Sequence, residues 1–252
     1  MSDNSITYLN AITELLTKIQ KEEKESIDKA AGVLAQALSE DRLIHVIGPG
    51  GHSNMAVEET FWRAGGLCAI NAILDPGTNL IHGAGRSSII ERTPGYARSV
   101  LDAYGVKSGD PLIIINAYGI NSMTIDCALE CKKRGVTSIA ITSTSFADSV
   151  PKDAPARHPS GQNLYQLADI FVDNHLPYGD AIVSVEGIPQ KIGPTSTFVN
   201  SFTINLLIIR TVEKAVKLGI RPAIWTSGNL PEGDTLNKDY MEKYGPRVKL
   251  LR

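Results

Sequence analysis

A glycine-rich segment, Gly48-Pro-Gly-Gly-His-Ser53, is the first part of the chain whose residue types favour ligand binding. It lies between an aliphatic run at residues 43–47 and a stretch of helical spacing that begins at residue 53. Glycines let the backbone approach a ligand and turn its N–H groups outward, and the start of a helix adds positive potential. The pattern therefore predicts an anion-binding loop, with a plain tight turn as the alternative. The residues expected to contact the substrate here are Gly50, Gly51, His52 and Ser53.

Two nucleotide-binding motifs are close to this loop in form but do not match it. The Rossmann fingerprint needs a third glycine three residues beyond the second, and Ser53 occupies that position. The Walker loop needs Gly-Lys-Ser or Gly-Lys-Thr, and neither sequence occurs in the chain. The sequence therefore indicates no dinucleotide and no other cofactor.

A second polar loop, Asn116-Ala-Tyr-Gly-Ile-Asn-Ser122, lies between an aliphatic run at residues 112–115 and a helical pattern at 122–134. A third candidate, Thr142-Ser-Thr-Ser145, follows the run at 138–142. In open parallel sheets, ligands bind at the loops beyond the carboxyl ends of the strands. These loops are therefore expected to share one composite site. Its expected substrate contacts are Asn116, Tyr118, Gly119, Asn121, Ser122 and Ser143.

The elements that must position these loops alternate between strands and helices. Strands are expected at residues 43–47, 68–71, 112–115, 138–142 and 170–173, and helices at 53–64, 96–104, 122–134 and 164–168. Two amphipathic helices are predicted within residues 1–40. This alternation is typical of an α/β protein with a mainly parallel sheet covered on both faces. The chain shows no clear linker or repeat, so a single domain over residues 1–252 is the simplest interpretation.

The C-terminal half carries three further expectations. Residues 182–185 and 190–192 flank Glu186-Gly187 and are predicted to pair as a hairpin at the edge of the sheet. Residues 196–218 are expected to form one long, mostly apolar helix, buried centrally or against another subunit. The proline-rich segment at 149–161 is expected to be a surface loop.

Composition limits the class of protein. The 252 residues are 42% hydrophobic and 21% charged, as in an ordinary globular protein, and the net charge is −2. General nucleic-acid binders and membrane-surface proteins need a basic field, so neither partner is expected. The N-terminus lacks the pattern of a signal peptide, and no apolar run approaches the ~20 residues of a membrane span. Cys68, Cys127 and Cys131 are interpreted as reduced thiols, and the expected compartment is the cytoplasm.

From about residue 43 to the C-terminus the chain resembles the sugar isomerase (SIS) domain family, and within it a group of phosphosugar-binding proteins related to phosphoheptose isomerases. The blocks that carry the resemblance are Gly50-Gly-His-Ser53, Glu59 with Arg63-Ala-Gly-Gly66, Glu91-Arg92 before Gly95-Tyr96-Ala97, Arg157-His158 with Ser160-Gly161, Ala168-Asp169, Asp173-Asn174, Gly179-Asp180-Ala181 and Gly193-Pro-Thr-Ser-Thr197. The resemblance implies a three-layer αβα sandwich, phosphosugar binding and commonly dimers or tetramers. Activities in the family include aldose–ketose isomerases, an etherase and sugar-sensing regulators, so membership indicates the ligand class better than the reaction.

One loop departs from the family pattern. SIS proteins usually hold phosphate with a Ser-x-Ser-Gly-x-Ser/Thr loop, whereas this chain has Asn116 and Tyr118 at the two serine positions and Asn121 at the third. An amide and a bulky phenol thus replace small hydroxyls. Either the anion sits differently or it is not a phosphate, and a sulfonate on the sugar fits weaker and bulkier donors. An altered or lost site is the remaining alternative.

An aldose–ketose isomerisation through an enediol needs a base that moves a proton between C1 and C2, and an acid that opens the ring. Glu59, in the expected helix after the first loop, is the first choice for the base, with a solvated surface carboxylate as the alternative. His82 and Glu91 flank residues 81–88, a segment long enough to fold over a ligand, and are the other catalytic candidates. His158 lies in a family-like block and is expected to hydrogen-bond the substrate. The histidines show no short-spaced metal motif, so no metal is expected.

The sequence thus predicts an isomerase that interconverts the aldose and ketose forms of a small anionic sugar by acid–base catalysis. The expected partner is that sugar, and a homo-oligomer is implied by the resemblance. A non-catalytic phosphosugar sensor is one alternative, although no DNA-binding helix-turn-helix precedes residue 43, which favours an enzyme. An etherase or lyase is the other, because Glu59 and Glu91 supply the two glutamates that an etherase uses.

Overall fold

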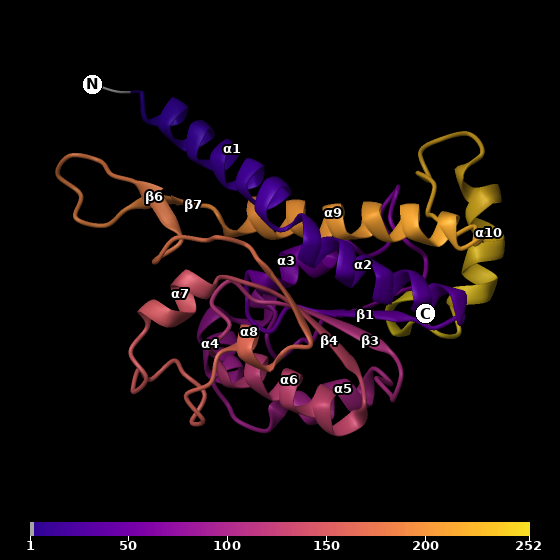
Figure 1. The fold of residues 1–252 in the computed structure, drawn as a ribbon, viewed down its shortest axis with the longest axis horizontal. Coiled ribbons are helices and arrows are strands. Elements are labelled where there is room, and N and C mark those ends of the chain that lie inside the picture. The colour runs from indigo at the N-terminus through magenta and orange to yellow at the C-terminus, as the bar shows by residue number, and fades with distance from the viewer. Residues whose placement is uncertain (1–2) are drawn as a thin grey trace.

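A five-stranded sheet forms the centre of the computed structural model, which describes residues 3–252 (Figure 1). The strands are β1 (Ile44–Ile47), β2 (Ile70–Ile73), β3 (Pro111–Ile115), β4 (Thr137–Thr142) and β5 (Ile170–Asp173). They lie in the order β2-β1-β3-β4-β5, and every neighbouring pair is parallel. Because parallel strands need crossover connections, the intervening helices pack on the faces of the sheet. The expected α/β class with a mainly parallel sheet is confirmed.

Helices cover both faces of this sheet (Figure 1). One layer contains α2 (Lys24–Ser39), α3 (Ser53–Glu58), α9 (Ser196–Lys217) and the C-terminal end of α1 (Asn4–Glu22). The other contains α5 (Tyr96–Ala103), α6 (Ser122–Arg134) and α8 (Leu164–Leu167). The remaining helices are α4 (Ala84–Glu91), α7 (Thr144–Ser149) and α10 (Gly233–Tyr244), with short 3-10 turns at η1 (Leu80–His82) and η2 (Lys249–Leu251). The two helices expected before the first strand are α1 and α2. Together the layers form the αβα sandwich that the resemblance implied.

The central strand β3 shows why the sheet must be covered on both faces. Ile113 and Ile115 pack in the hydrophobic cluster that contains residues of α2 and α9. Leu112 and Ile114 pack in the opposite cluster, which contains residues of α5 and α6. Successive side chains of a strand point to opposite faces, so a continuous aliphatic run buries itself only between two helical layers. The aliphatic runs seen in the sequence are therefore the core of the fold.

The helix after the first loop is shorter than the expected span of residues 53–64. α3 ends at Glu58, and the chain then turns, with φ angles of 50° at Trp62 and 86° at Gly65. Both angles lie in the left-handed region, which a right-handed helix cannot contain. The backbone N–H of Gly65 instead donates to the Trp225 carbonyl oxygen at 2.8 Å. This early end changes the direction of the residues that follow α3.

Two strand expectations are also corrected. β2 begins at Ile70 rather than at residue 68, because the N–H of Cys68 donates to the Ala223 carbonyl oxygen at 2.9 Å and so pairs with the C-terminal segment. β6 (Ala181–Val183) and β7 (Ile192–Pro194) form the expected hairpin, but as a separate two-stranded sheet rather than at the edge of the central one. The hairpin projects from the body beside α1 (Figure 1), and the Tyr8 hydroxyl donates to the Pro194 carbonyl oxygen at 2.6 Å.

The long helix expected at residues 196–218 is α9, and it is buried on one face. Val199, Ile204 and Leu207 pack in the cluster that contains residues of α2. Phe198 and Ile209 are 52% and 53% exposed. Contacts within this chain therefore bury one side of α9, and apolar side chains on its other side remain exposed.

The cysteine thiols are buried and free, as expected of reduced thiols. Burial raises the pKa of Cys68 and of Cys131 to about 12, so these thiols stay protonated near neutral pH. Within residues 3–252, no helix combines the length and the apolarity that a membrane crossing requires.

Candidate functional site

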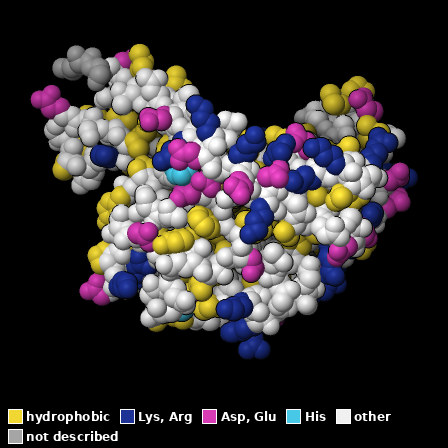
Figure 2. Space-filling model, viewed as in Figure 1, with side chains coloured by type: hydrophobic (Ala, Val, Ile, Leu, Met, Phe, Trp, Pro, Cys, Tyr) yellow, Lys and Arg dark blue, Asp and Glu magenta, His cyan; other side chains and the backbone are white. Residues whose placement is uncertain are grey.

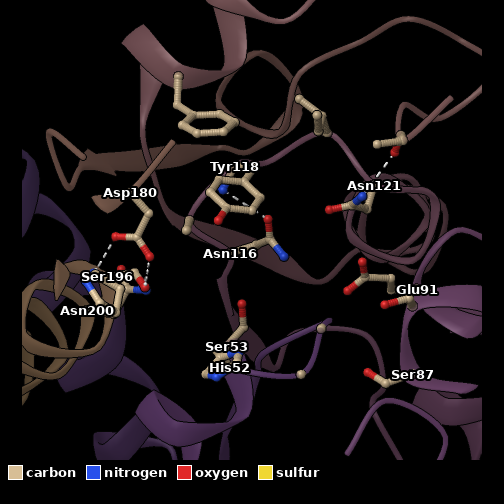
Figure 3. A pocket seen from close by; sticks show the side chains of 18 of the residues that line it. His52, Ser53, Ser87, Glu91, Asn116, Tyr118, Asn121, Asp180, Ser196 and Asn200 are labelled. Atoms are coloured by element: carbon tan, nitrogen blue, oxygen red, sulfur yellow. Dashed lines mark hydrogen bonds between the residues drawn. The ribbon is translucent and has the colours of Figure 1, made fainter. Parts of the chain in front are cut away.

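The loops after β1 and β3 open onto one crevice because of the order of the strands. β2 lies on one side of β1 and β3 on the other, so the helices that follow β1 and β3 pack on opposite faces of the sheet. Loops that leave neighbouring strands toward opposite faces diverge, and a crevice remains at the carboxyl ends of the strands. A cavity of about 660 Å³ lies there (Figure 3). This volume is in the range of small-ligand sites.

Segments far apart in the sequence line this cavity. The loop after β1 supplies Gly50, Gly51, His52 and Ser53, and the loop after β3 supplies Asn116, Tyr118 and Asn121. Helix α4 supplies Ser87, Ser88 and Glu91, and helix α7 supplies Phe146. The segment before β6 supplies Tyr178 and Asp180, and the start of α9 supplies Ser196, Thr197 and Asn200. The tertiary structure is what brings these side chains together.

The loop after β1 needs its glycines because other groups approach them closely. A Cβ atom at Gly48 would lie 2.2 Å from the Ser53 carbonyl oxygen, and one at Gly50 would lie 2.8 Å from Glu91 Oε2. Gly50 also has a φ angle of 137°, which residues with side chains rarely adopt. The turn brings His52 and Ser53 to the cavity (Figure 3), and neither side chain is hydrogen-bonded within residues 3–252. Both are therefore available to a ligand.

The loop after β3 is closed by one of its own side chains. The buried Asn116 accepts two backbone N–H groups at Oδ1, from Tyr118 at 3.1 Å and from Gly119 at 2.8 Å. Its Nδ2 donates to the Pro49 carbonyl oxygen at 2.7 Å and so ties the two loops together. These backbone donors, which are the usual ligands for an anion at such a turn, are already bonded.

Glu91 is the carboxyl group in the cavity that is best suited to proton transfer. It is the last residue of α4, and its side chain points into the cavity (Figure 3). Among the contacts of the described chain, its carboxylate has no hydrogen-bond or ion-pair partner. Burial raises the pKa of Glu91, and the positive charge of Arg92 opposes that effect only in part. A carboxyl group with a raised pKa gains and loses its proton closer to neutral pH.

Three stacked aromatic rings form one wall of the cavity. The rings of Tyr118 and Phe146 are 4.1 Å apart at an angle of 21°, and those of Phe146 and Tyr178 are 5.2 Å apart at 23°. Such a stack presents a rigid, flat surface to a ligand. Burial, assisted by the carboxylates of Asp180 and Glu91, raises the pKa of Tyr118. Its hydroxyl therefore stays protonated and can donate a hydrogen bond.

Asp180 joins the segment before β6 to the start of α9. Its Oδ1 accepts the backbone N–H groups of Thr195 and Ser196, both at 2.8 Å, and its Oδ2 accepts the Ser196 hydroxyl at 2.7 Å. A carboxylate at the N-terminus of a helix satisfies N–H groups that have no helical partner. Asp180 itself has a φ angle of 64°, a conformation that aspartate tolerates better than most residues. This contact fixes two distant segments at the rim of the cavity (Figure 3).

The structure brings part of the expected site together. The expected residues that line the cavity are Gly50, Gly51, His52, Ser53, Glu91, Asn116, Tyr118 and Asn121. The expected residues that lie outside its lining are Glu59, His82, Gly119, Ser122, Ser143 and His158. Asn121 also holds the wall of the cavity, because its Nδ2 donates to the Ala156 carbonyl oxygen at 2.9 Å.

Glu59 faces α9 rather than the cavity. Its Oε1 accepts a hydrogen bond from Asn205 Nδ2 at 3.0 Å and lies 2.9 Å from Arg63 Nε. Glu59 continues the helical backbone of α3, since its N–H donates to the Met55 carbonyl oxygen at 3.0 Å, and it lies on the side of the helix that packs against α9. His82 is exposed in η1, outside the cavity. Of the three catalytic candidates from the sequence, Glu91 is the one that the structure brings to the cavity.

The other residues outside the lining hold the local fold. Ser143 is the buried N-cap of α7. His158 Nε2 lies 3.3 Å from Asp126 Oδ1, so the imidazole ring pairs with a carboxylate of α6. Gly119 supplies the left-handed position of its turn, with φ 63°, and Ser122 is buried as the first residue of α6. These positions support the loops without contributing a side chain to the cavity.

Several cavity residues were missed by reasoning from the sequence. They are Ser87, Ser88, Phe146, Tyr178, Asp180, Ser196, Thr197 and Asn200. A signal existed for Asp180 and Ser196, since both lie in family-like blocks to which no role was assigned. Ser87 and Phe146 lie in short helices that the sequence did not predict, so no comparable signal was available for them.

Comparison with solved structures shows the same fold in two phosphoheptose isomerases. The phosphoheptose isomerase of Francisella tularensis aligns with a TM-score of 0.54 and 14% identity, over 82% of this chain and 95% of that one. The phosphoheptose isomerase of Neisseria gonorrhoeae aligns with a TM-score of 0.52 and 14% identity, over 84% of this chain and 97% of that one. At this identity the likeness shows the fold alone.

Sequence comparison shows the family. The UPF0309 protein of Geobacillus thermodenitrificans is 36% identical over 244 residues, which cover 97% of this chain and 96% of that protein. The UPF0309 protein of Shouchella clausii is 35% identical over 245 residues, which cover 97% and 98%. A sequence model of the SIS domain matches residues 7–143, more than half of the chain. Together with the sheet order and the crevice beyond β1 and β3, this match means that the chain belongs to the SIS domain family.

Proposed function

We propose that this protein is an aldose–ketose isomerase that acts on a small anionic sugar, carrying a phosphate or a sulfonate. Glu91 is the base in this proposal. It removes the proton from C2 of the open-chain aldose and returns it to C1 through an enediol, while a proton passes from O2 to O1. No atoms or electrons leave the substrate, so the reaction needs no redox cofactor.

The observation that carries this proposal is the state of Glu91. Its carboxyl group lines the cavity, lacks a partner among the described residues and has a raised pKa because of burial. A group of this kind is what proton transfer near neutral pH needs. His52, Ser53 and the Tyr118 hydroxyl line the same cavity and are proposed to hydrogen-bond the oxygens of the sugar, including the oxygen that becomes negative in the enediolate.

The two alternatives from the sequence fit this geometry less well. An etherase with two working glutamates would need Glu59 near the substrate, and Glu59 is bonded to Asn205 and Arg63 on the side of α9. A non-catalytic sensor does not need a partly buried carboxyl group without a bonding partner at its ligand. Isomerisation uses that group directly.

Two measurements test the proposal. A thermal-shift screen compares sugar phosphates, sugar sulfonates and neutral sugars, and the sugars that stabilise the protein are then incubated with it in deuterated water. Isomerisation should introduce deuterium at C2 of the recovered aldose. If no anionic sugar stabilises the protein, the proposed ligand class is wrong. Stabilisation without deuterium incorporation would support the sensor instead.

We also propose that the protein is a homo-oligomer. The arm formed by α1 and the β6–β7 hairpin stands away from the body, and Figure 2 shows the surface hollowed between this arm and the C-terminal part of the chain. Exposed apolar side chains on the arm and on the adjoining start of α9 are Ile6, Leu9, Ile192 and Phe198. Clustered apolar exposure of this kind favours association. Sedimentation at several protein concentrations tests it, and a monomer at all of them would contradict it.

A further inference from the structure

The turn after β3 has the form of an anion-binding turn, and Asn116 already occupies it. Asn116 Oδ1 accepts the neighbouring N–H groups of Tyr118 and Gly119 at 3.1 and 2.8 Å. Gly119 is in the left-handed region, with φ 63°. Successive N–H groups that converge on one point in such a turn form the concavity in which proteins bind phosphate oxygens. Here the oxygen at that point belongs to the protein itself.

The carboxamide of Asn116 is fixed at both ends. Its Nδ2 donates to the Pro49 carbonyl oxygen at 2.7 Å, and the side chain is almost fully buried, with 4% exposure. The two N–H groups need an acceptor and the Pro49 carbonyl needs a donor, so the amide fits in only one orientation. A ligand anion that displaced it would break three hydrogen bonds, two of them between buried groups. The occupant is therefore part of the fold rather than a movable gate.

The side chains around this turn offer little compensation to a phosphate. The Tyr118 ring lies beside Asn116 and belongs to the aromatic wall (Figure 3), and the carboxylates of Glu91 and Asp180 line the same space. Arg92 is the one lysine or arginine in the described lining, and it is exposed. A phosphate group brings a charge of about −1.5 to −2 near neutral pH, and burying such a charge is costly unless N–H groups or cations pair with it, whereas the N–H groups of this turn are already bonded to Asn116.

We propose that Asn116 is a specificity residue that excludes phosphate from this turn, so that the part of the substrate facing the loop after β3 is uncharged. A ring face or a hydroxymethyl group can pack against Tyr118 without displacing the amide. Any charged group of the sugar lies elsewhere in the cavity. The inference rests on the proposed function for the sugar substrate, but the exclusion of phosphate can be measured without turnover.

Inorganic phosphate is the probe for the test. Asn116→Ser removes the carboxamide that joins the N–H groups of Tyr118 and Gly119 to Pro49, and leaves a shorter, more weakly bonded hydroxyl in its place. Phosphorus NMR line broadening and thermal shift should show saturable phosphate binding by Asn116→Ser that is at least about tenfold tighter than by the wild type. Asn237→Ser is the matched control, because it makes the same change at a buried amide that bonds to the backbone of Thr226, outside the lining of this cavity. It should gain no phosphate affinity.

A second measurement on the wild type keeps the proposal falsifiable if Asn116→Ser does not fold. In an amide NMR titration with phosphate, the signals of Tyr118 and Gly119 should stay in place. Saturable shifts at these two amides would overturn the proposal, and so would equal phosphate affinity of the wild type and Asn116→Ser. A negative deuterium-exchange assay, in contrast, bears on the isomerase proposal and not on these titrations.

Discussion

Replacing Glu91 by glutamine tests the proposed chemistry most directly. The substitution keeps the shape of the side chain and removes its ionisation. A positioned acid–base group contributes about 100- to 10,000-fold to a rate, or about 3 to 5 kcal/mol of the barrier. Because Glu91 is the candidate base that lines the cavity, the rate of deuterium incorporation at C2 should fall by a factor in this range. Binding of the sugar, measured by thermal shift, should change far less.

The pH dependence of Glu91 gives two further readouts of opposite sign. Burial raises its pKa above the ordinary value of 4.5, and the base works when ionised, so activity should be lost as the pH falls through the raised pKa. The free energy of unfolding behaves differently. A carboxyl group with a raised pKa in the folded state contributes most stability below its unfolded pKa, and that contribution falls as the pH rises toward the folded pKa. Glu91→Gln should therefore be more stable than the wild type at neutral pH and equal to it in acid.

Two glutamate variants serve as controls for this experiment. Glu58→Gln changes an exposed carboxylate at the end of α3, and Glu59→Gln changes the carboxylate that is bonded to Asn205 and Arg63. Both variants should keep the exchange activity of the wild type. Full exchange activity in Glu91→Gln would refute the reasoning, and so would a folded Glu59→Gln protein that has lost the activity.

Three predictions concern the framework around the cavity. Asp180→Ala should lower the free energy of unfolding by about 2 to 4 kcal/mol in urea titrations, since it removes several hydrogen bonds to the start of α9. Asp180→Asn should lower it less. Equal stability of the alanine variant and the wild type would contradict this prediction. Gly48→Ala should lower the free energy of unfolding by about 2 kcal/mol or more, because the new Cβ would lie 2.2 Å from the Ser53 carbonyl oxygen. Gly32→Ala, in open space within α2, is the control and should raise the free energy of unfolding by about 0.5 to 1 kcal/mol. The buried thiols should react with a thiol reagent only after unfolding, and rapid labelling of the native protein would show that they are accessible. These thiols are Cys68, Cys127 and Cys131.

The sequence by itself determined the class of fold and most of the loops that form the cavity. The run at residues 112–115 is aliphatic at every position, and such a short run is typical of a strand covered on both faces. Once such strands are parallel, the loops at their carboxyl ends share one edge of the sheet. Gly50, Ser53 and Asn116 were therefore predicted for one site before any contact was known, and all three line the cavity.

The tertiary structure decided which side chains face that cavity. Glu59 and Glu91 are similar candidates in sequence, but Glu59 lies on the side of α3 that packs against α9 and bonds to Asn205, while α4 carries Glu91 inward. Asp180 and Ser196 meet only because the β6–β7 hairpin returns the chain to the same place. The direction of the Asn116 amide likewise depends on the carbonyl group of Pro49, in a different loop. Local sequence patterns report which face of an element is buried, whereas the orientation of a polar side chain depends on partners that are distant in the chain.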